Sequence, residues 1–234
     1  MTTSICTRGD ELYPRKLLEI HKSPVKIFYR GDIGILNSEA NVAIIGSRNA
    51  SEKGSAVAYD YGRRAAEAGL VVVNGLAMGC DTEAIKGALS CGGKCAVVLA
   101  SGLDRITPKC NIGLAEEVLD KGGCLLSEYI DGTPPFKGYY VDRDRIQSGI
   151  SQGVIVIETE LDGGTMHTAR FANSQLRRLA CYYSKLSEMK SGNKYIIEKR
   201  MGIPLSTDED LQEFFAQLKS EKNMVYEQQV LNLT

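Results

Sequence analysis

Short apolar runs rich in Val, Ile and Leu alternate with longer helical stretches over most of this chain. The runs lie at 42–45, 70–74, 95–100, 124–127, 154–157 and 179–183, and the helical stretches at 54–68, 81–90, 111–121, 144–151 and 165–177. Strands and helices in alternation form a mostly parallel sheet with right-handed crossovers. Strands that are buried on both faces need near-continuous apolar runs. The sequence therefore predicts an α/β fold of the Rossmann-like, doubly wound type, with helices on both faces.

The 234 residues are enough for one large α/β domain with small additions. We expect residues 1–36 to pack on that domain as a short N-terminal extension, 37–220 to form the domain, and 221–234 to be a tail that is frayed or contacts a partner. We expect no C-terminal winged helix, because too few residues follow the last predicted strand. Weaker signals predict a short helix at 11–14, strands at 25–29 and 203–205, and helices at 192–200 and 207–219.

Composition excludes several classes of protein and site. The polar start and the lack of an apolar run of about 18 residues argue against a signal peptide or a membrane span. Seven scattered cysteines without a CxxC pair, and only two histidines, fit free thiols in the cytoplasm better than a zinc site or a disulfide framework. The net charge of −1 neither favours nor excludes a polyanion, which needs only a local basic patch.

The segment 41–51, NVAIIGSRNAS, reads as a strand, a tight turn and a helix start. The strand ends at Gly46, and Ser51 is a good helix N-cap. Unpaired N–H groups at such a helix start suit an anion, and Arg48 adds a fork-shaped donor. Alternatively, Gly46 only turns the chain and Arg48 is solvated. No complete GxGxxG or Walker pattern decides between the two.

Glycine-rich loops follow five of the predicted strands. In a doubly wound sheet these loops meet at the carboxyl ends of the strands, where ligands bind. Glycine lets the backbone approach a ligand, although strand-to-helix turns favour glycine in any case. Five such loops at one edge favour a polyanionic or nucleotide-like ligand. The loops are 46–48, 75–81, 101–104, 128–145 and 158–165.

The last of these loops is the most phosphate-like. Gly163, Gly164 and Thr165 lead directly into a helix, so their N–H groups and the Thr165 hydroxyl are suited to cradle an anion, with Thr168 one turn further on. Nearby carboxylates, Asp162 among them, oppose an anion unless they bind hydroxyls or point away.

Basic and aromatic residues are interleaved in the segment 131–151. Cations bind phosphates and rings stack on bases, at about 1–3 kcal/mol per base, which suits single-stranded nucleic acid. In the alternative interpretation the rings pack inward and the arginines pair with Asp142 and Asp144, and this segment alone slightly favours that alternative. The residues concerned are Lys137, Arg143, Arg145, Phe136, Tyr139 and Tyr140.

No catalytic residue is predicted. The two histidines lie far apart, and the chain contains neither a GxSxG elbow nor an HExxH motif. We interpret His167, which follows the apolar Met166, as a packing residue. No metal ligand or cofactor is predicted either.

Six motifs together resemble the DprA/Smf family of DNA-processing proteins. They are VAIIGSRNASEKG, VVVNGLAMGCDTEAIKGAL, GGKCAVVLASGLDRITPKCN, LLSEYIDGTPPF, RDRIQSGIS and DGGTMHTA, in the family's order over about 41–205. The resemblance implies an extended Rossmann-like domain and a homodimer. It also implies binding of single-stranded DNA without chemistry, and loading of the recombinase RecA on incoming strands during transformation.

The resemblance also implies a phosphate-binding pocket, with Lys137 where the family loop approaches DNA. This chain departs from the family at Met78, Lys86, Asp144 and the pair Tyr140-Val141, where the family usually has Arg, His, Asn and Phe-Pro. Met78 and Asp144 make the pocket less positive. The residues implied for the pocket are Gly46, Ser47, Arg48, Arg143, Arg145, Gly164, Thr165 and Thr168.

A second hypothesis is a nucleotide-binding sensor module or a nucleoside-monophosphate phosphoribohydrolase of the same superfamily. For that function Glu158 and Asp162 would face a ribose. The basic segment 137–145 instead favours DNA.

Overall fold

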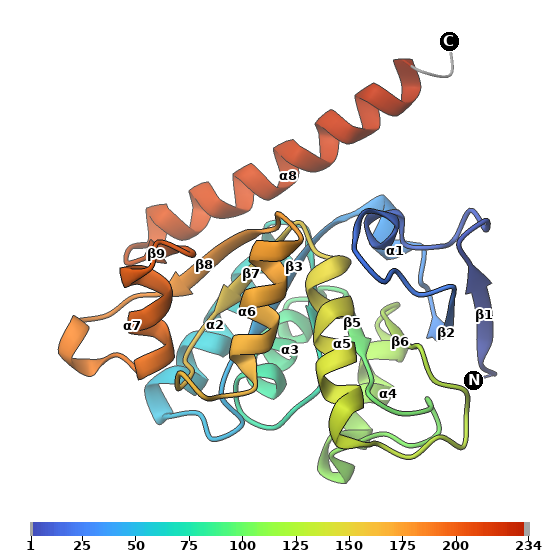
Figure 1. Cartoon of the computed structure of the whole chain (residues 1–234), viewed down its shortest axis with the longest axis horizontal. Coiled ribbons are helices and arrows are strands. Elements are labelled where there is room, and N and C mark those ends of the chain that lie inside the picture. Colours follow the sequence, from blue (N-terminus) through green and yellow to red (C-terminus); the bar gives the residue numbers. More distant parts are fainter. Residues whose placement is uncertain (1, 232–234) are drawn as a thin grey trace.

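The computed structural model describes residues 2–231, with side chains for 2–185 and 187–220. It contains one nine-stranded sheet in the order β1-β2-β6-β5-β4-β3-β7-β8-β9 (Figure 1). Strands β3 to β9 are mutually parallel, and β2 pairs antiparallel with both β1 and β6. The strands are β1 Ser4–Thr7, β2 Lys26–Gly31, β3 Ala40–Ile45, β4 Leu70–Asn74, β5 Cys95–Val98, β6 Cys124–Ser127, β7 Gly153–Val156, β8 Arg178–Tyr182 and β9 Ile203–Leu205. The predicted α/β, doubly wound, mostly parallel fold is confirmed.

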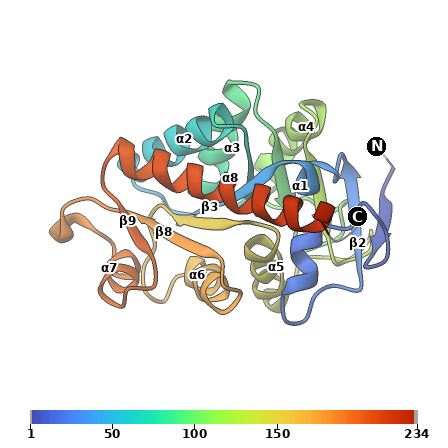
Figure 2. The same cartoon turned by 90° about the horizontal axis from the view of Figure 1, so that it is seen from above.

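Helices cover both faces of the sheet, as Figure 2 shows for α2, α3 and α4 on one side and α5, α6 and α7 on the other. Three short 3-10 helices occur at Arg15–Glu19, Lys109–Asn111 and Leu186–Glu188. The α-helices are α1 Ile35–Ser38, α2 Glu52–Glu67, α3 Cys80–Ser90, α4 Ile112–Asp120, α5 Lys137–Gly149, α6 Thr165–Ser174, α7 Ser191–Glu198 and α8 Asp208–Leu231.

Successive residues of the central strands enter opposite halves of the core. In β3, Val42 and Ile44 belong to the hydrophobic cluster beneath α2 and α3, whereas Ala43 and Ile45 belong to the cluster beneath α5 and α6. A strand alternates its side chains between the two faces of a sheet, so burial on both faces demands an unbroken apolar run. This is the physical reason that the apolar runs predicted the strands.

The N-terminal segment extends the sheet. Strand β2 matches the strand predicted at 25–29, whereas β1 was not predicted. The helix expected at 11–14 is wrong: the first helical turn is the 3-10 helix Arg15–Glu19, directly after Pro14. Proline has a suitable φ for the start of a helix and lacks the N–H that would otherwise be unpaired there. Tyr13 and Leu17 are buried in the cluster beneath α5 and α6.

Two helices differ in length from the prediction. Helix α5 begins at Lys137 instead of 144, so most of the expected loop is helical. Glycine and two adjacent tyrosines at its start have poor helix propensity, and packing overrides this preference. Helix α8 continues to Leu231, through most of the segment expected as a tail, and 232–234 lie outside the described residues. Within residues 2–231, no helix is long and apolar enough to span a membrane.

A buried carboxylate fixes the turn after β3. Glu158, just beyond β7, accepts hydrogen bonds from the backbone N–H of Ser51 at 2.5 Å and from its hydroxyl at 2.8 Å. Ser51 in turn caps α2, because its Oγ accepts from the N–H of Gly54 at 2.9 Å. The backbone carbonyl of Glu158 accepts from the N–H of Ser47 at 2.8 Å. Both carboxylate oxygens of Glu158 are thus used in the fold, and the expectation that they face a ribose is wrong.

We expect Glu158→Ala to lower the free energy of unfolding by about 1–3 kcal/mol, because the part-buried N–H and hydroxyl donors of Ser51 lose a charged acceptor. Urea denaturation measures this loss. Glu52→Ala is the matched control, since Glu52 is an exposed acidic residue at the start of the same helix, and we expect it to cost less than about 1 kcal/mol. Equal losses in the two variants would contradict the role assigned to Glu158.

Candidate functional site

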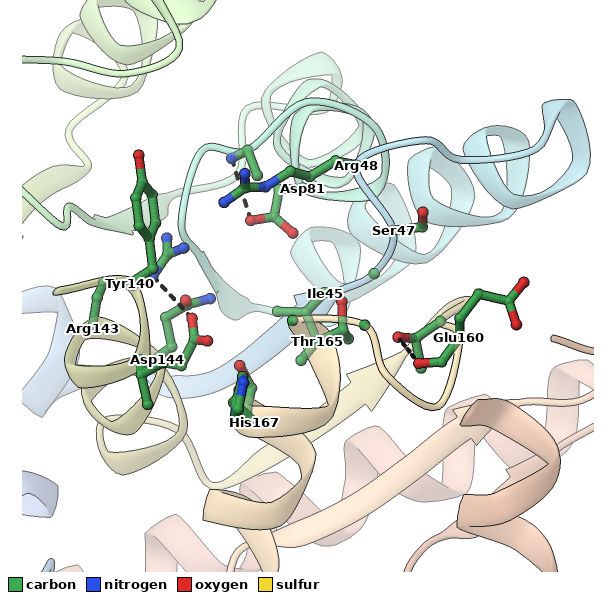
Figure 3. A pocket seen from close by; sticks show the side chains of 18 of the residues that line it. Ile45, Ser47, Arg48, Asp81, Tyr140, Arg143, Asp144, Glu160, Thr165 and His167 are labelled. Atoms are coloured by element: carbon green, nitrogen blue, oxygen red, sulfur yellow. Dashed lines mark hydrogen bonds and ion pairs between the residues drawn. The ribbon is translucent and has the colours of Figure 1, made fainter. Parts of the chain in front are cut away.

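A pocket of about 680 Å³ lies where the carboxyl ends of β3 and β7 meet. The chain leaves β3 toward β4 on one side and reaches β7 on the other, and this switch of direction opens a crevice at that edge. Figure 3 shows Tyr140, Arg143 and Asp144 of α5 on one side of it, with Arg48 and Ser47 opposite. The lining includes Gly46, Ser47, Arg48, Asp81, Phe136, Lys137, Tyr140, Arg143, Asp144, Gln147, Glu160, Gly163, Gly164, Thr165, His167 and Thr168.

Every predicted site residue except Arg145 lines this pocket. The guanidinium of Arg145 instead pairs with the carboxylate of Glu128 and donates to the backbone carbonyl of Lys22. Residues two apart on an α-helix point about 200° apart. Since α5 includes both Arg143 and Arg145, only one of them can face the pocket.

The mouth of the pocket is basic, because the exposed carboxylate that lines it, Glu160, is paired with Lys190. Arg48 and Lys137 are exposed, and neither forms an ion pair with a carboxylate of the described residues. The guanidinium carbon of Arg48 lies 5.1 Å from the centroid of the Tyr140 ring, a cation–π contact that positions it. Two exposed and unneutralised cations therefore face a ligand that enters here.

The N-terminus of α6 adds backbone donors to the mouth. Gly164 is the N-cap and provides no side-chain cap, and within the described chain the N–H groups of Gly164 and Thr165 have no acceptor. Open N–H groups and the positive end of the helix dipole suit an anion. Thr165 and Thr168 line the pocket beside them.

The floor of the pocket is acidic, although it contains an arginine. Arg143 is only 6% exposed, and it donates from Nε to Asp144 Oδ1 at 3.1 Å and from Nη1 to the carbonyl of Val98 at 3.1 Å. The carboxylate of Asp81 accepts from the N–H of Gly75 at 3.0 Å. One buried guanidinium thus shares the floor with two carboxylates.

Burial dominates the titration of these carboxyl groups. It raises the pKa of Asp81 to about 6 and the pKa of Asp144 to about 6, and the positive charge of Arg143 opposes the increase in both cases. Both groups are therefore mainly ionised at neutral pH and become protonated in mildly acidic solution.

Gly75 makes room for Arg143. A Cβ atom at position 75 would lie 1.2 Å from Arg143 Nη1, so only glycine allows the guanidinium to cross this loop and reach Val98. This glycine has a packing function, beyond the preference of strand-to-helix turns for glycine.

Some side chains of the segment 131–151 are arranged to bind nucleic acid, as in the first interpretation of this segment, and others pack on the protein, as in the second. Phe136 is 66% exposed at the pocket, and Tyr140 lies 5.9 Å from the guanidinium carbon of Arg143. Tyr139 instead stacks on Tyr129 with ring centroids 4.0 Å apart. The ion pair of Arg143 with Asp144 also agrees with the interpretation in which the arginines of this segment pair with its acids.

Two pocket residues were missed or misread in the sequence. His167 is exposed and lines the pocket, so its interpretation as a packing residue is wrong. Gln147 lines the floor and is 2% exposed. It lies three residues after Asp144 within the helix predicted at 144–151, so the i, i+3 spacing already placed the two residues on one face and was a signal that could have identified Gln147. Asp162 does not line the pocket, so neither acid of the phosphoribohydrolase hypothesis faces it.

Comparison with known proteins gives consistent matches. The sequence profile of the family described as DNA recombination-mediator protein A matches residues 4–216. DNA processing protein DprA of Streptococcus pneumoniae is 35% identical over 206 residues, which are 88% of this chain and 72% of that protein. Protein Smf of Escherichia coli is 33% identical over 87% of this chain, and this match spans about half, 54%, of Smf.

Solved structures agree. DprA from Streptococcus pneumoniae superposes with a TM-score of 0.82 at 31% identity, over 91% of this chain and 74% of that one. DNA processing protein A from Helicobacter pylori, whose structure is described as revealing its single-stranded DNA binding mode, superposes with a TM-score of 0.83 at 26% identity, over 94% and 97%. The molybdenum cofactor binding protein of Rippkaea orientalis, at 18% identity and a TM-score of 0.55, shares only the fold.

The raised pKa of Asp144 predicts how stability depends on pH. The protonated carboxyl favours the folded state, so its contribution is complete below about pH 4 and is lost as the pH rises through about 6. Between pH 4 and 7.5 we expect the free energy of unfolding of the wild type to fall by about 2–3 kcal/mol relative to Asp144→Asn.

Urea denaturation at several pH values measures this difference. Asp142→Asn, which changes an exposed residue of the same helix, should follow the wild type. A wild type that gains stability relative to Asp144→Asn as the pH rises would show that the pKa of Asp144 is not raised.

Proposed function

Because this chain belongs to the DNA recombination-mediator protein A family, we propose that it binds single-stranded DNA at the pocket between β3 and β7, without cutting or joining the strand. Its relatives are DNA-processing proteins, and so is this chain. The single-stranded DNA binding described for the Helicobacter pylori protein supports the proposal for this one.

The observation that carries the proposal is the chemistry of the pocket mouth. Arg48 and Lys137 are exposed without a carboxylate partner in the described chain, and the open N–H groups of α6 lie on the same pocket as the exposed ring of Phe136. Cations and open N–H groups bind phosphates, and an exposed ring stacks on an unpaired base. A single strand offers both partners along its length, whereas a duplex hides its bases.

The net charge of −1 is compatible with this function. Binding of a polyanion depends on the local potential, and among the residues whose side chains are described no carboxylate pairs with either cation of the mouth. The acidic floor weakens the attraction, so we expect moderate affinity with a clear dependence on salt.

The family's description as a recombination mediator supports a further step, in which the bound strand is protected and passed to the recombinase RecA in the cytoplasm. Formation of RecA filaments on an oligonucleotide coated with single-strand binding protein tests this step. The resemblance also supports a homodimer, and multi-angle light scattering measures the mass of the protein in solution.

The first test of the proposal is binding of a labelled oligo-dT in a salt series, followed by fluorescence anisotropy. Arg48→Ala and Lys137→Ala should each weaken binding. Each should also make the negative slope of the log association constant against log salt shallower by about 0.7, the value for one phosphate contact of a single strand. We expect the double variant to lose about twice as much.

Lys121→Ala is the matched control, because Lys121 is an exposed cation at the amino ends of the strands, away from the pocket. It should bind as the wild type does. Unchanged affinity and slope in both pocket variants would show that the DNA lies elsewhere.

A further inference from the structure

The mouth of the pocket is positively charged, whereas its floor carries two carboxylates. Arg48, Lys137 and the N-terminus of α6 make the mouth attractive to phosphate, whereas Asp81 and Asp144 on the floor repel it. A nucleotide that enters with its phosphate at the mouth therefore directs a different part toward the floor. Carboxylates there accept hydrogen bonds, so that part must be a donor.

Two groups on the floor have unused hydrogen-bonding capacity. Asp144 uses Oδ1 for Arg143, and its Oδ2 accepts no hydrogen bond within the described chain. Gln147 is 2% exposed, lines the pocket, and its side-chain amide has no partner among the residues whose side chains are described. Because this amide lines the pocket and is not used by the protein, its donors and its acceptor are available to a ligand.

The two groups are placed to act together. Asp144 and Gln147 are three residues apart on α5 and therefore neighbours on one face of the helix. Asp144 presents only acceptors, and the amide of Gln147 adds donors beside them. A cavity of about 680 Å³ is in the range that holds a nucleotide.

We propose that this floor reads a nucleobase and prefers guanine, with the carboxylate of Asp144 accepting from guanine N1–H and N2–H and the amide of Gln147 donating to O6. Guanine is the one common base whose pairing edge has two adjacent donors next to an acceptor. The pairing edges of adenine, cytosine and thymine place an acceptor beside each donor, and that acceptor would face a carboxylate oxygen. Such repulsion gives specificity as effectively as attraction does. The inference rests on the proposed function, that the pocket binds single-stranded DNA.

The test compares five labelled pentanucleotides, dT2-X-dT2, in which X is dG, dI, dA, dC or dT. Deoxyinosine has the edge of guanine without the N2 amino group, so it isolates the second hydrogen bond without any change in the protein. A good bidentate contact discriminates between bases by about 5- to 150-fold. We therefore expect dG to bind at least fivefold more tightly than dA, dC or dT, and dI to lose most of that advantage.

Variants then assign the effect to residues. Asp144→Asn should reduce the preference for dG over dA to less than twofold and strengthen binding of the all-dT pentamer, because a negative charge is removed from the floor. Gln147→Leu should likewise remove the preference. Asp142→Asn, on the same helix but exposed, should retain it.

The outcomes separate this inference from the proposed function. Equal wild-type affinity for all five oligonucleotides would overturn guanine recognition and leave DNA binding standing. A wild-type preference for dG that dI shares in full, or one that persists in Asp144→Asn, would overturn the role given to Asp144. Absence of binding to every oligonucleotide at low salt would overturn both.

Discussion

The buried guanidinium of Arg143 is the interaction on which the pocket depends. It connects three elements, because it pairs with Asp144 on its own helix, donates to the carbonyl of Val98 at the end of β5, and crosses the loop after β4 above Gly75. A buried charge without a partner is strongly destabilising. The carboxylates of the floor are therefore part of what allows an arginine to lie there.

The contacts of Arg143 determine where in the pocket a phosphate can bind. Arg143 is largely occupied by protein partners and is not free to bind a phosphate as an exposed arginine would. In the proposed function, phosphate is therefore bound further out, by Arg48, Lys137 and the first residues of α6. The carboxylate of Asp144 thus has two functions in our proposals, since it pairs with Arg143 and is also the acceptor for the base.

Sequence reasoning found most of the pocket because it used topology. Residues 46–48 and 163–165 follow parallel strands directly, and the carboxyl ends of such strands meet at one edge. It erred where the local pattern was weak. The segment 137–143 has no clear helical period, so the sequence did not show that Arg143 and Arg145 lie on different faces of one helix.

The order of strands and helices, the two covered faces of the sheet and the glycine loops at one edge were determined by the sequence alone. They follow from hydrophobic periodicity and glycine placement, which are local properties. Only the tertiary structure decided which charged side chains form ion pairs or hydrogen bonds within the protein and which can bind a ligand. Glu158 holds the helix cap Ser51, Arg145 pairs with Glu128, and Arg143 is buried, whereas Arg48 and Lys137 have no ion-pair partner among the described residues. Ion pairs and burial depend on residues far apart in the chain, and no local pattern encodes them.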